Sequence, residues 1–386
     1  MNFELNDDQF AFQQLARDFA ARELAPQAAR WDAEAHFPVE VFRQGGELGF
    51  CGLYSPPEQG GLGLTRLDSA IVFEELAAAD PSTAAFFPIH NMATWMLCGW
   101  GQDALKAEWG PALTSGAKLA SYCLTEPDAG SDAANLKTSA RRDGDDYVLK
   151  GAKAFISGAG STDMLVVMAR SGVAGAKGIS AFAVPADLPG IRYGKKEDKM
   201  GWNSQPTRAI FFDDVRVPAA NRLGEEGEGF RIAMKGLDGG RINIATCSVG
   251  AAQGAFNAAQ RYLGERQQFG KKLADFQALQ FRLADMATEL VAARQMIRLA
   301  ASKLDAAAPD TSIYCAMAKR FATDAGFNVC NEALQLHGGY GYLRDYPLER
   351  LLRDSRVHQI LEGTNEIMRV IIARRMLEAD APDSIR

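Results

Sequence analysis

The stretch Leu279-Gln-Phe-Arg-Leu-Ala-Asp-Met-Ala-Thr-Glu-Leu-Val-Ala-Ala-Arg-Gln-Met-Ile297 carries an apolar residue at every third or fourth position. Its stripe consists of Leu279, Leu283, Met286, Leu290, Ala293 and Ile297. At 1.5 Å per residue, the stripe predicts a helix of about 30 Å with one buried face. The helical period begins again near Gly227 and persists, and long amphipathic helices pack as bundles. The sequence therefore predicts a C-terminal helical bundle domain over residues 226–386.

The pattern upstream of the bundle changes to short β-rich runs separated by turn residues. Strands are expected at 119–124, 147–150, 164–170, 179–184 and 210–217, with a hairpin at Lys150-Gly-Ala-Lys153. These runs predict a middle β domain over residues 118–225.

Residues 1–117 show helical patterns. Asn6 or Asp7 can cap a first helix that stops before Pro26, and further helices are expected at 66–79 and 83–100. They predict an N-terminal α-helical domain.

Composition excludes several classes of protein. The chain has 386 residues, 47% hydrophobic and 23% charged, which is long enough for two or three folded domains. A net charge of −6 with dispersed Lys and Arg argues against nucleic-acid binding. The most apolar window, 84–100, is interrupted by Pro88, His90, Asn91 and Gly99, so no membrane span is expected.

The N-terminal residues show no secretory or transit signal, which favours a bacterial-type cytoplasmic location or, alternatively, a processed organelle protein. The six cysteines form no Cys-x-x-Cys pair and no metal-ligand spacing with the histidines, so reduced core residues and no metal site are expected.

One carboxylate stands out in the segment Val357-His-Gln-Ile-Leu-Glu-Gly-Thr-Asn-Glu-Ile-Met-Arg369. Glu362 follows the apolar pair Ile360-Leu361 and directly precedes a Gly-Thr turn. A carboxylate pressed against apolar neighbours loses hydration, so its basicity rises toward the range that removes a proton from carbon. An isolated Leu-Glu-Gly is more often a surface glutamate at a helix end, and only its context decides between the two.

That context comes from a second segment, Tyr122-Cys-Leu-Thr-Glu-Pro-Asp-Ala-Gly-Ser-Asp132. Together the two segments resemble the acyl-CoA dehydrogenase family, and the resemblance covers essentially the whole chain. It implies an α+β, mostly α fold with an N-terminal α-helical domain, a middle β-barrel-like domain and a C-terminal four-helix bundle. It also implies that Glu362 removes the α proton of an acyl-CoA thioester while FAD takes the β hydride.

No Gly-x-Gly-x-x-Gly follows a strand, so a Rossmann site for the dinucleotide is unsupported. The resemblance implies that FAD is held in a different way. Phe155 stands where much of the family has Trp, so it keeps a stacking surface without an indole donor. The bundle contacts from Arg266 onward are expected to reach the FAD of a neighbouring subunit. The implied FAD-binding residues are Tyr122, Cys123, Leu124, Thr125, Gly130, Ser131, Phe155, Ile156, Ser157, Arg266, Phe276, Gln277, Gln335, Leu336, His337, Gly338, Gly339, Thr364, Asn365 and Glu366.

The implied acyl-CoA contacts come from three places in the chain. They are Ser131, the segment Asp238-Gly239-Gly240-Arg241, which is expected to open a bundle helix, and Arg374. Some family members carry the base at the position of Gly240, which has no side chain, so Glu362 is the carboxylate left at either position.

The segment Lys199-Met-Gly-Trp-Asn-Ser-Gln-Pro-Thr-Arg208 resembles the family members of valine breakdown that convert isobutyryl-CoA to methacrylyl-CoA. A straight-chain or 2-methylbutyryl-CoA preference stays open, because one methylene changes discrimination only about 10 to 200-fold.

The resemblance implies electron-transfer flavoprotein as the acceptor and a homotetramer built as a dimer of dimers. An oxygen-using oxidase and a non-catalytic FAD-containing binding protein are the alternatives.

Overall fold

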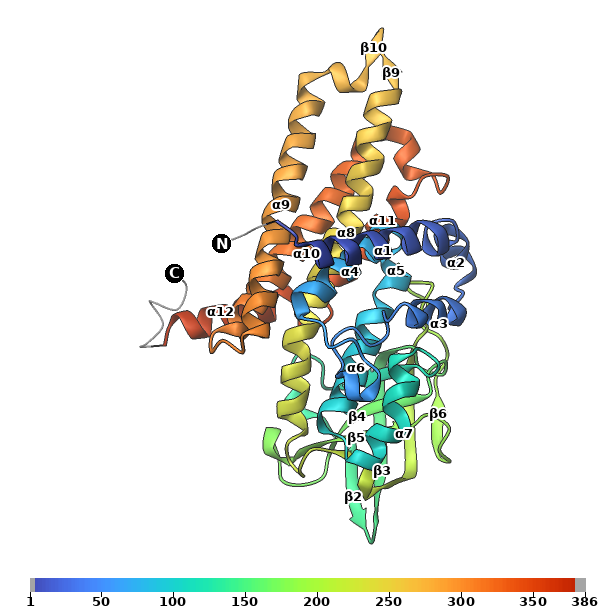
Figure 1. The fold of residues 1–386 in the computed structure, drawn as a ribbon, viewed down its shortest axis with the longest axis vertical. Coiled ribbons are helices and arrows are strands. Elements are labelled where there is room, and N and C mark those ends of the chain that lie inside the picture. The colour runs from blue at the N-terminus through green and yellow to red at the C-terminus, as the bar shows by residue number, and fades with distance from the viewer. Residues whose placement is uncertain (1–3, 379–386) are drawn as a thin grey trace.

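The computed structural model describes residues 4–378, which form two helical regions and a β sheet (Figure 1). The sheet lies at one end of the longest axis and the tips of the long helices lie at the other. The outer ends of the predicted first and last domains, 1–3 and 379–386, lie outside the described residues, as does the start of the segment searched for a targeting signal.

The N-terminal region consists of helices, as predicted. The first begins at a capping box in which Asn6 accepts from the Gln9 N–H and the Gln9 side chain accepts from the Asn6 N–H. It continues as a π-helical turn at Ala20–Leu24 and ends before Pro26. The helix expected at 83–100 is divided into two at Ala85. The helices are α1 (Asp7–Phe19), α2 (Ala28–Glu34), α3 (Val39–Glu47), α4 (Arg66–Ala79), α5 (Pro81–Ala84), α6 (Phe86–Trp100) and α7 (Asp103–Thr114).

The middle region is one mixed sheet, paired in the order β6-β7-β3-β2-β4-β5-β8, with β1 beside β4. β4 pairs in parallel with β1 and β2, and the other pairs are antiparallel. The strands are β1 (Ala120–Cys123), β2 (Ser139–Asp143), β3 (Asp146–Ser157), β4 (Met164–Arg170), β5 (Ile179–Pro185), β6 (Ile191–Tyr193), β7 (Thr207–Pro218) and β8 (Arg222–Leu223). Strands β2, β6 and β8 were not predicted.

The hairpin predicted at 150–153 is wrong. β3 runs through these residues beside β7, with a register shift between Leu149 and Gly151. A Cβ at Gly151 would lie 2.6 Å from the Thr138 hydroxyl oxygen, so this glycine marks a close approach and a bulge rather than a turn. The hairpin lies earlier, between β2 and β3, where Gly144 has a φ of 62°.

The C-terminal region is built on three long helices, and the predicted stripe lies on one of them. Met286, Leu290, Ala293 and Ile297 are all buried. The helices are α8 (Gly229–Glu265), α9 (Gln277–Asp305), α10 (Thr311–Leu336), α11 (Leu348–Arg356) and α12 (Asn365–Met376), and the short strands β9 (Gln267–Gln268) and β10 (Lys271–Lys272) close the tip between α8 and α9.

Helix α8 connects the three regions, because it packs against α4, α10 and β5. The prediction that Asp238 opens a helix is wrong, since α8 already begins at Gly229. Two consecutive glycines therefore lie in a helix interior, where each costs about 1 kcal/mol relative to alanine. Such a cost suggests that the space left by these glycines is used.

The cysteines are buried and unpaired, as predicted. Within residues 4–378, no helix combines the length and the apolar character needed to cross a membrane.

Candidate active site

Glu362 lies in a turn of unusual backbone conformation between the 3-10 turn Val357–Gln359 and α12. Its φ is 55° and that of Gly363 is 91°. A residue other than glycine rarely adopts a positive φ, and such strain concentrates at functional sites. The turn therefore holds the Glu362 side chain in a direction that relaxed backbone would not give.

The carboxylate of Glu362 is desolvated. Its Oε2 atom is buried and has no hydrogen-bond partner among the described residues. Burial raises the pKa of Glu362 to about 7, while the positive charges of Arg241 and Lys319 act in the opposite direction. A carboxyl group of this pKa is a stronger base than an exposed glutamate and is still substantially ionised at neutral pH.

The two glycines inside α8 make room for charged side chains. A Cβ at Gly240 would lie 2.5 Å from Oε2 of Glu362, and a Cβ at Gly239 would lie 2.5 Å from Nη1 of Arg66. Residues 122 positions apart in the sequence thus meet at Gly240. The carboxylate occupies the space that a side chain at position 240 would need.

Three further residues around Glu362 were missed by the sequence analysis. Lys319 on α10 donates to the Gly363 carbonyl oxygen at 2.7 Å. The guanidinium of Arg66 lies over the Tyr54 ring, 3.5 Å from its centroid. Burial raises the pKa of the Tyr54 hydroxyl, and the negative charge of Glu362 acts in the same direction. Lys319 was detectable as a lone lysine in the apolar stripe of α10, between the buried Cys315 and Ala322. Nothing in the local sequence marks Arg66 or Tyr54.

The two segments predicted to contact the flavin ring lie side by side. The Ala154 N–H donates to the Thr125 carbonyl at 2.9 Å, and the Ser121 hydroxyl donates to the Ser157 carbonyl at 2.7 Å. Lys153 forms a buried ion pair with Glu126 at 2.8 Å and also donates to the Leu124 carbonyl at 3.0 Å. The end of β1 is thereby fastened to the end of β3.

Phe155 provides an observation that fits a flat aromatic cofactor. Its side chain is 70% exposed and its φ is 58°, so a strained backbone presents an apolar ring to solvent. Aromatic rings stack on flat heteroaromatic groups, and the neighbouring Thr125 offers polar atoms at the same edge. The Tyr122 hydroxyl on β1 is buried without a partner among the described residues, and both burial and Glu362 raise the pKa of this group well above its usual range. These residues fit the predicted flavin ring.

The predicted cofactor residues of the bundle lie elsewhere. Arg266 directly follows Glu265, the last residue of α8, which lies 25 residues beyond Gly240, or about 37 Å along the helix axis. Its guanidinium lies 5.5 Å from the centroid of the Tyr340 ring, and the ring of His337 stacks on Tyr262 at 4.3 Å. Figure 1 shows this tip of the bundle at the end of the molecule opposite the sheet. The structure therefore divides the predicted cofactor residues into two groups within one chain.

The group at the bundle tip contains eight predicted residues, of which Leu336 and His337 are buried. They are Arg266, Phe276, Gln277, Gln335, Leu336, His337, Gly338 and Gly339.

The other predicted residues differ in how their side chains are placed. Thr364 caps α12 by accepting from the Ile367 N–H. The Asn365 side chain is hydrogen-bonded to Lys319, Thr323 and Asp324, so only the Asn365 backbone could contact a ligand. Arg241 forms an ion pair with Asp238 at 2.6 Å and leaves Nε unpartnered among the described residues. Gly130, Ser131, Glu366 and Arg374 are exposed.

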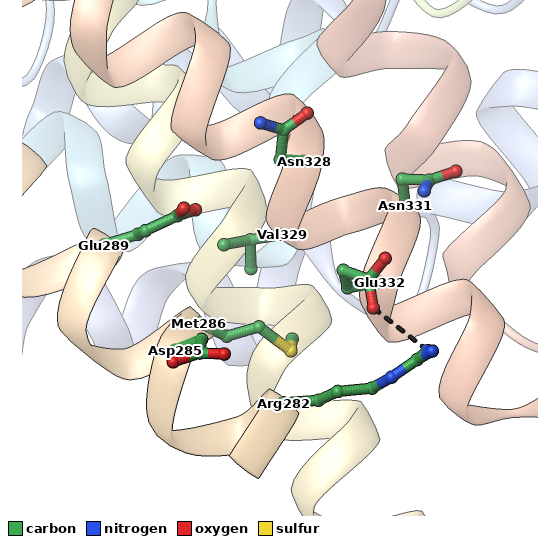
Figure 2. Close-up of a pocket in the computed structure, with 8 residues that line it drawn as sticks. All are labelled: Arg282, Asp285, Met286, Glu289, Asn328, Val329, Asn331 and Glu332. Atoms are coloured by element: carbon green, nitrogen blue, oxygen red, sulfur yellow. Dashed lines mark hydrogen bonds and ion pairs between the residues drawn. The ribbon is translucent and has the colours of Figure 1, made fainter. Parts of the chain in front are cut away.

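A separate hollow lies between α9 and α10 (Figure 2). It is lined by Arg282, Asp285, Met286, Glu289, Asn328, Val329, Asn331 and Glu332. An ion pair of 3.1 Å joins Arg282 to Glu332 across it. It contains no predicted site residue, so it is distinct from the site at Glu362.

Comparison with known proteins gives matches along the chain. The family models for the N-terminal, middle and C-terminal domains of acyl-CoA dehydrogenase match residues 6–117, 121–215 and 227–377. The mitochondrial isobutyryl-CoA dehydrogenase of Bos taurus is 54% identical over 374 residues, which cover 97% of this chain and 90% of the relative.

Two solved structures share the fold. Butyryl-CoA dehydrogenase from Megasphaera elsdenii has a TM-score of 0.95 at 39% identity, covering 98% of this chain and 100% of the other. A structure from work on the electron transferring flavoprotein of Acidaminococcus fermentans also has a TM-score of 0.95, at 41% identity, with 98% and 100% covered.

Proposed function

The chain belongs to the acyl-CoA dehydrogenase family, and from this premise we propose that it oxidises isobutyryl-CoA to methacrylyl-CoA in valine breakdown, with Glu362 as the base. The observation that carries the chemical part of the proposal is the buried, unpartnered Oε2 of Glu362 against Gly240. The family is FAD-dependent, and the protein is a FAD-dependent acyl-CoA dehydrogenase.

The proposed chemistry begins with a proton transfer to Glu362. An α C–H bond is too weak an acid for a lone carboxylate, so the thioester carbonyl must be polarised as the negative charge develops. The Glu362 backbone N–H is the donor proposed from this chain, because it stands next to the base. Bound FAD supplies the acceptor for the hydride that leaves the β carbon. Arg241 and Lys319 keep Glu362 ionised, while burial keeps it basic.

The proposed substrate rests on similarity rather than on pocket shape. The relative from Bos taurus carries the name of an isobutyryl-CoA dehydrogenase, and it supports a short branched acyl chain. The structural relative named butyryl-CoA dehydrogenase is less similar in sequence and keeps the straight-chain alternative in the test.

The proposed acceptor is electron-transfer flavoprotein, in line with the solved structure from work on such a protein. We also propose a homotetramer in which the bundle tip around Arg266 binds the FAD of a neighbouring subunit, because about 37 Å of helix separates it from Gly240 in its own chain. The cytoplasmic location stays a prediction, since the name of the relative from Bos taurus places that protein in mitochondria.

The test is anaerobic bleaching of the flavin in the purified protein by isobutyryl-, butyryl-, isovaleryl- and 2-methylbutyryl-CoA. The proposal predicts that isobutyryl-CoA bleaches fastest. Faster bleaching by another ester would transfer the substrate assignment to that ester, and a flavin bleached by none would refute the proposed short acyl chain and favour an unlisted acyl chain or a binding role. Oxygen consumption at the rate of dye reduction would favour an oxidase instead of electron-transfer flavoprotein.

A further inference from the structure

Lys319 is a buried lysine whose direct partners are uncharged. It lies on α10, and its side chain is fully buried. Its ammonium group donates to the Gly363 carbonyl oxygen at 2.7 Å and to the Asn365 side-chain oxygen at 2.9 Å. A buried ammonium costs several kcal/mol of lost hydration and normally takes a carboxylate as its direct partner. The ammonium group of Lys319 is therefore bound to two neutral oxygens, both in residues that closely follow Glu362.

These two bonds are made to the turn around Glu362, whose backbone conformation is unusual. Gly363 follows Glu362 directly, and both residues have positive φ angles of 91° and 55°. A backbone in this conformation persists only where its surroundings hold it. Lys319 supplies a short, charge-assisted bond to the peptide unit that follows the base.

The side chain of Asn365, which accepts from Lys319, belongs to a hydrogen-bond network that reaches both sides of the turn. The Asn365 amide donates to the Asp324 carboxylate at 2.7 Å, and the Gln359 amide donates to the same carboxylate at 2.8 Å. Gln359 lies before Glu362 and Asn365 lies after it, so α10 holds the two ends of the turn through Asp324 and its middle through Lys319.

We propose that Lys319 is a positioning residue for the base, and that its ammonium group fixes the left-handed turn that directs the Glu362 carboxylate against Gly240. The inference rests on the proposed role of Glu362. It adds a residue on a different helix that acts through the turn and through its charge, without touching the reacting atoms.

The charge of Lys319 acts on the basicity of Glu362 as well as on its position. The groups that face Glu362 are Arg241 from α8, Lys319 from α10, Tyr122 from β1 and Tyr54 from the segment before α4. The groups that face Lys319 are Glu362, Asp324, Arg241, Glu366 and the buried His358. Removing the positive charge of Lys319 leaves Arg241 alone to oppose burial, so the pKa of Glu362 must rise.

The experiment is single-turnover flavin reduction by isobutyryl-CoA between pH 5.5 and 9 in the FAD-loaded protein. Lys319→Met removes the charge and the donor but keeps an unbranched side chain. We expect the limiting rate to fall about 10 to 100-fold because the base is displaced, and the pH midpoint to rise by about one unit because the base loses a neighbouring cation.

A second variant separates position from charge. Lys319→Gln keeps an N–H donor near the Gly363 carbonyl and removes the charge. We expect it to recover part of the limiting rate while its midpoint stays as high as that of Lys319→Met. A loss of rate from general destabilisation would not move the midpoint.

The matched control is Lys303→Met on α9. Lys303 forms an ion pair with Asp310 at 2.5 Å, so this control also removes one lysine and its partner bonds. It should keep the wild-type midpoint.

The inference is overturned if Lys319→Met retains FAD together with either the wild-type limiting rate or the wild-type midpoint. If Lys319→Met does not fold, a wild-type midpoint in Lys319→Gln overturns it equally. Failure of the proposed function has a different signature, because then wild type is not bleached or Glu362→Gln is reduced like wild type.

Discussion

Replacing Glu362 by Gln should stabilise the protein above pH 7 and leave its stability unchanged near pH 4.5. The folded-state pKa of Glu362 is raised from 4.5 to about 7, with burial as the main cause. A raised pKa means that the folded state favours the protonated carboxyl. Burial of this group therefore costs no stability below pH 4.5, the pKa of Glu362 in the unfolded chain. The cost of ionising the buried carboxyl grows between pH 4.5 and 7 and is complete above pH 7.

The magnitude follows from the size of the shift. A difference of about 2.5 pKa units at 1.36 kcal/mol per unit gives about 3 kcal/mol. This is an upper limit, because the Glu362 side chain is partly exposed and solvent screens part of the penalty. Gln keeps the shape of the side chain and also buries a polar atom, so the variant differs from wild type mainly in the lost charge.

The assay is thermal unfolding of the FAD-loaded protein at several pH values from 5 to 9, without substrate. Protein and FAD concentrations are held fixed, since binding shifts the midpoint by mass action. Glu108→Gln, which removes an exposed carboxylate on α7, controls for the change in net charge. The expected result is a difference between Glu362→Gln and wild type that is small at pH 5, grows as the pH rises and reaches a positive plateau above pH 7.

Two outcomes would refute the reasoning. If Glu362→Gln is less stable than wild type at pH 8, the ionised carboxylate stabilises the fold and is not desolvated. A gain that is equal at pH 5 and pH 8 would show that packing rather than ionisation separates the two side chains.

Three more predictions concern the rate, the space around the base and the cofactor. The same Glu362→Gln variant should keep FAD but reduce flavin bleaching by several orders of magnitude, and bleaching at the wild-type rate would exclude Glu362 as the base. Gly240→Ala places a methyl group 2.5 Å from the Glu362 carboxylate and should slow flavin reduction about 100-fold. The control Gly264→Ala, whose Cβ meets nothing within 4 Å, should keep the wild-type rate. Equal rates in the two variants would mean that the space at Gly240 is unused. Arg266→Ala should weaken FAD retention on dilution and the oligomer measured by size-exclusion chromatography, and unchanged retention would remove the proposed contact with a neighbouring FAD.

The elements that could be predicted from the sequence are those with a clear apolar pattern. The one-sided stripe on α9 and the strands β4 and β5, which are buried along almost their whole length, belong to this group. Strand β2 reads Ser-Ala-Arg-Arg-Asp and buries only Ala140, so its identity as a strand comes from pairing with β3. The error at Gly151 has the same origin, because only the packed sheet reveals the approach of Thr138.

The candidate site could be predicted only where the chemistry of one residue was visible locally. Glu362 was singled out by its apolar approach and its turn, and the family resemblance favoured a base over a surface glutamate. Its contact with Gly240 could not be derived from spacing, because it depends on how α8 packs against the C-terminal turn. The Gly-Gly pair was expected at a helix start, because glycine is unfavourable in a helix interior. In the structure the pair lies inside α8, where the missing side chains leave room for Arg66 and Glu362.

The same desolvation that costs stability at Glu362 produces its basicity, so the two cannot be adjusted separately by burial alone. Deeper burial without nearby cations would raise the pKa further and leave the carboxyl protonated at neutral pH, where it could not accept a proton. Exposure would return the pKa toward 4.5 and weaken the base. Arg241 from α8 and Lys319 from α10 resolve this conflict, because their charges oppose the effect of burial without restoring contact with water. In the proposed role of Lys319, one buried cation from a second helix both limits the rise in the pKa of Glu362 and holds the strained turn that carries the proposed base.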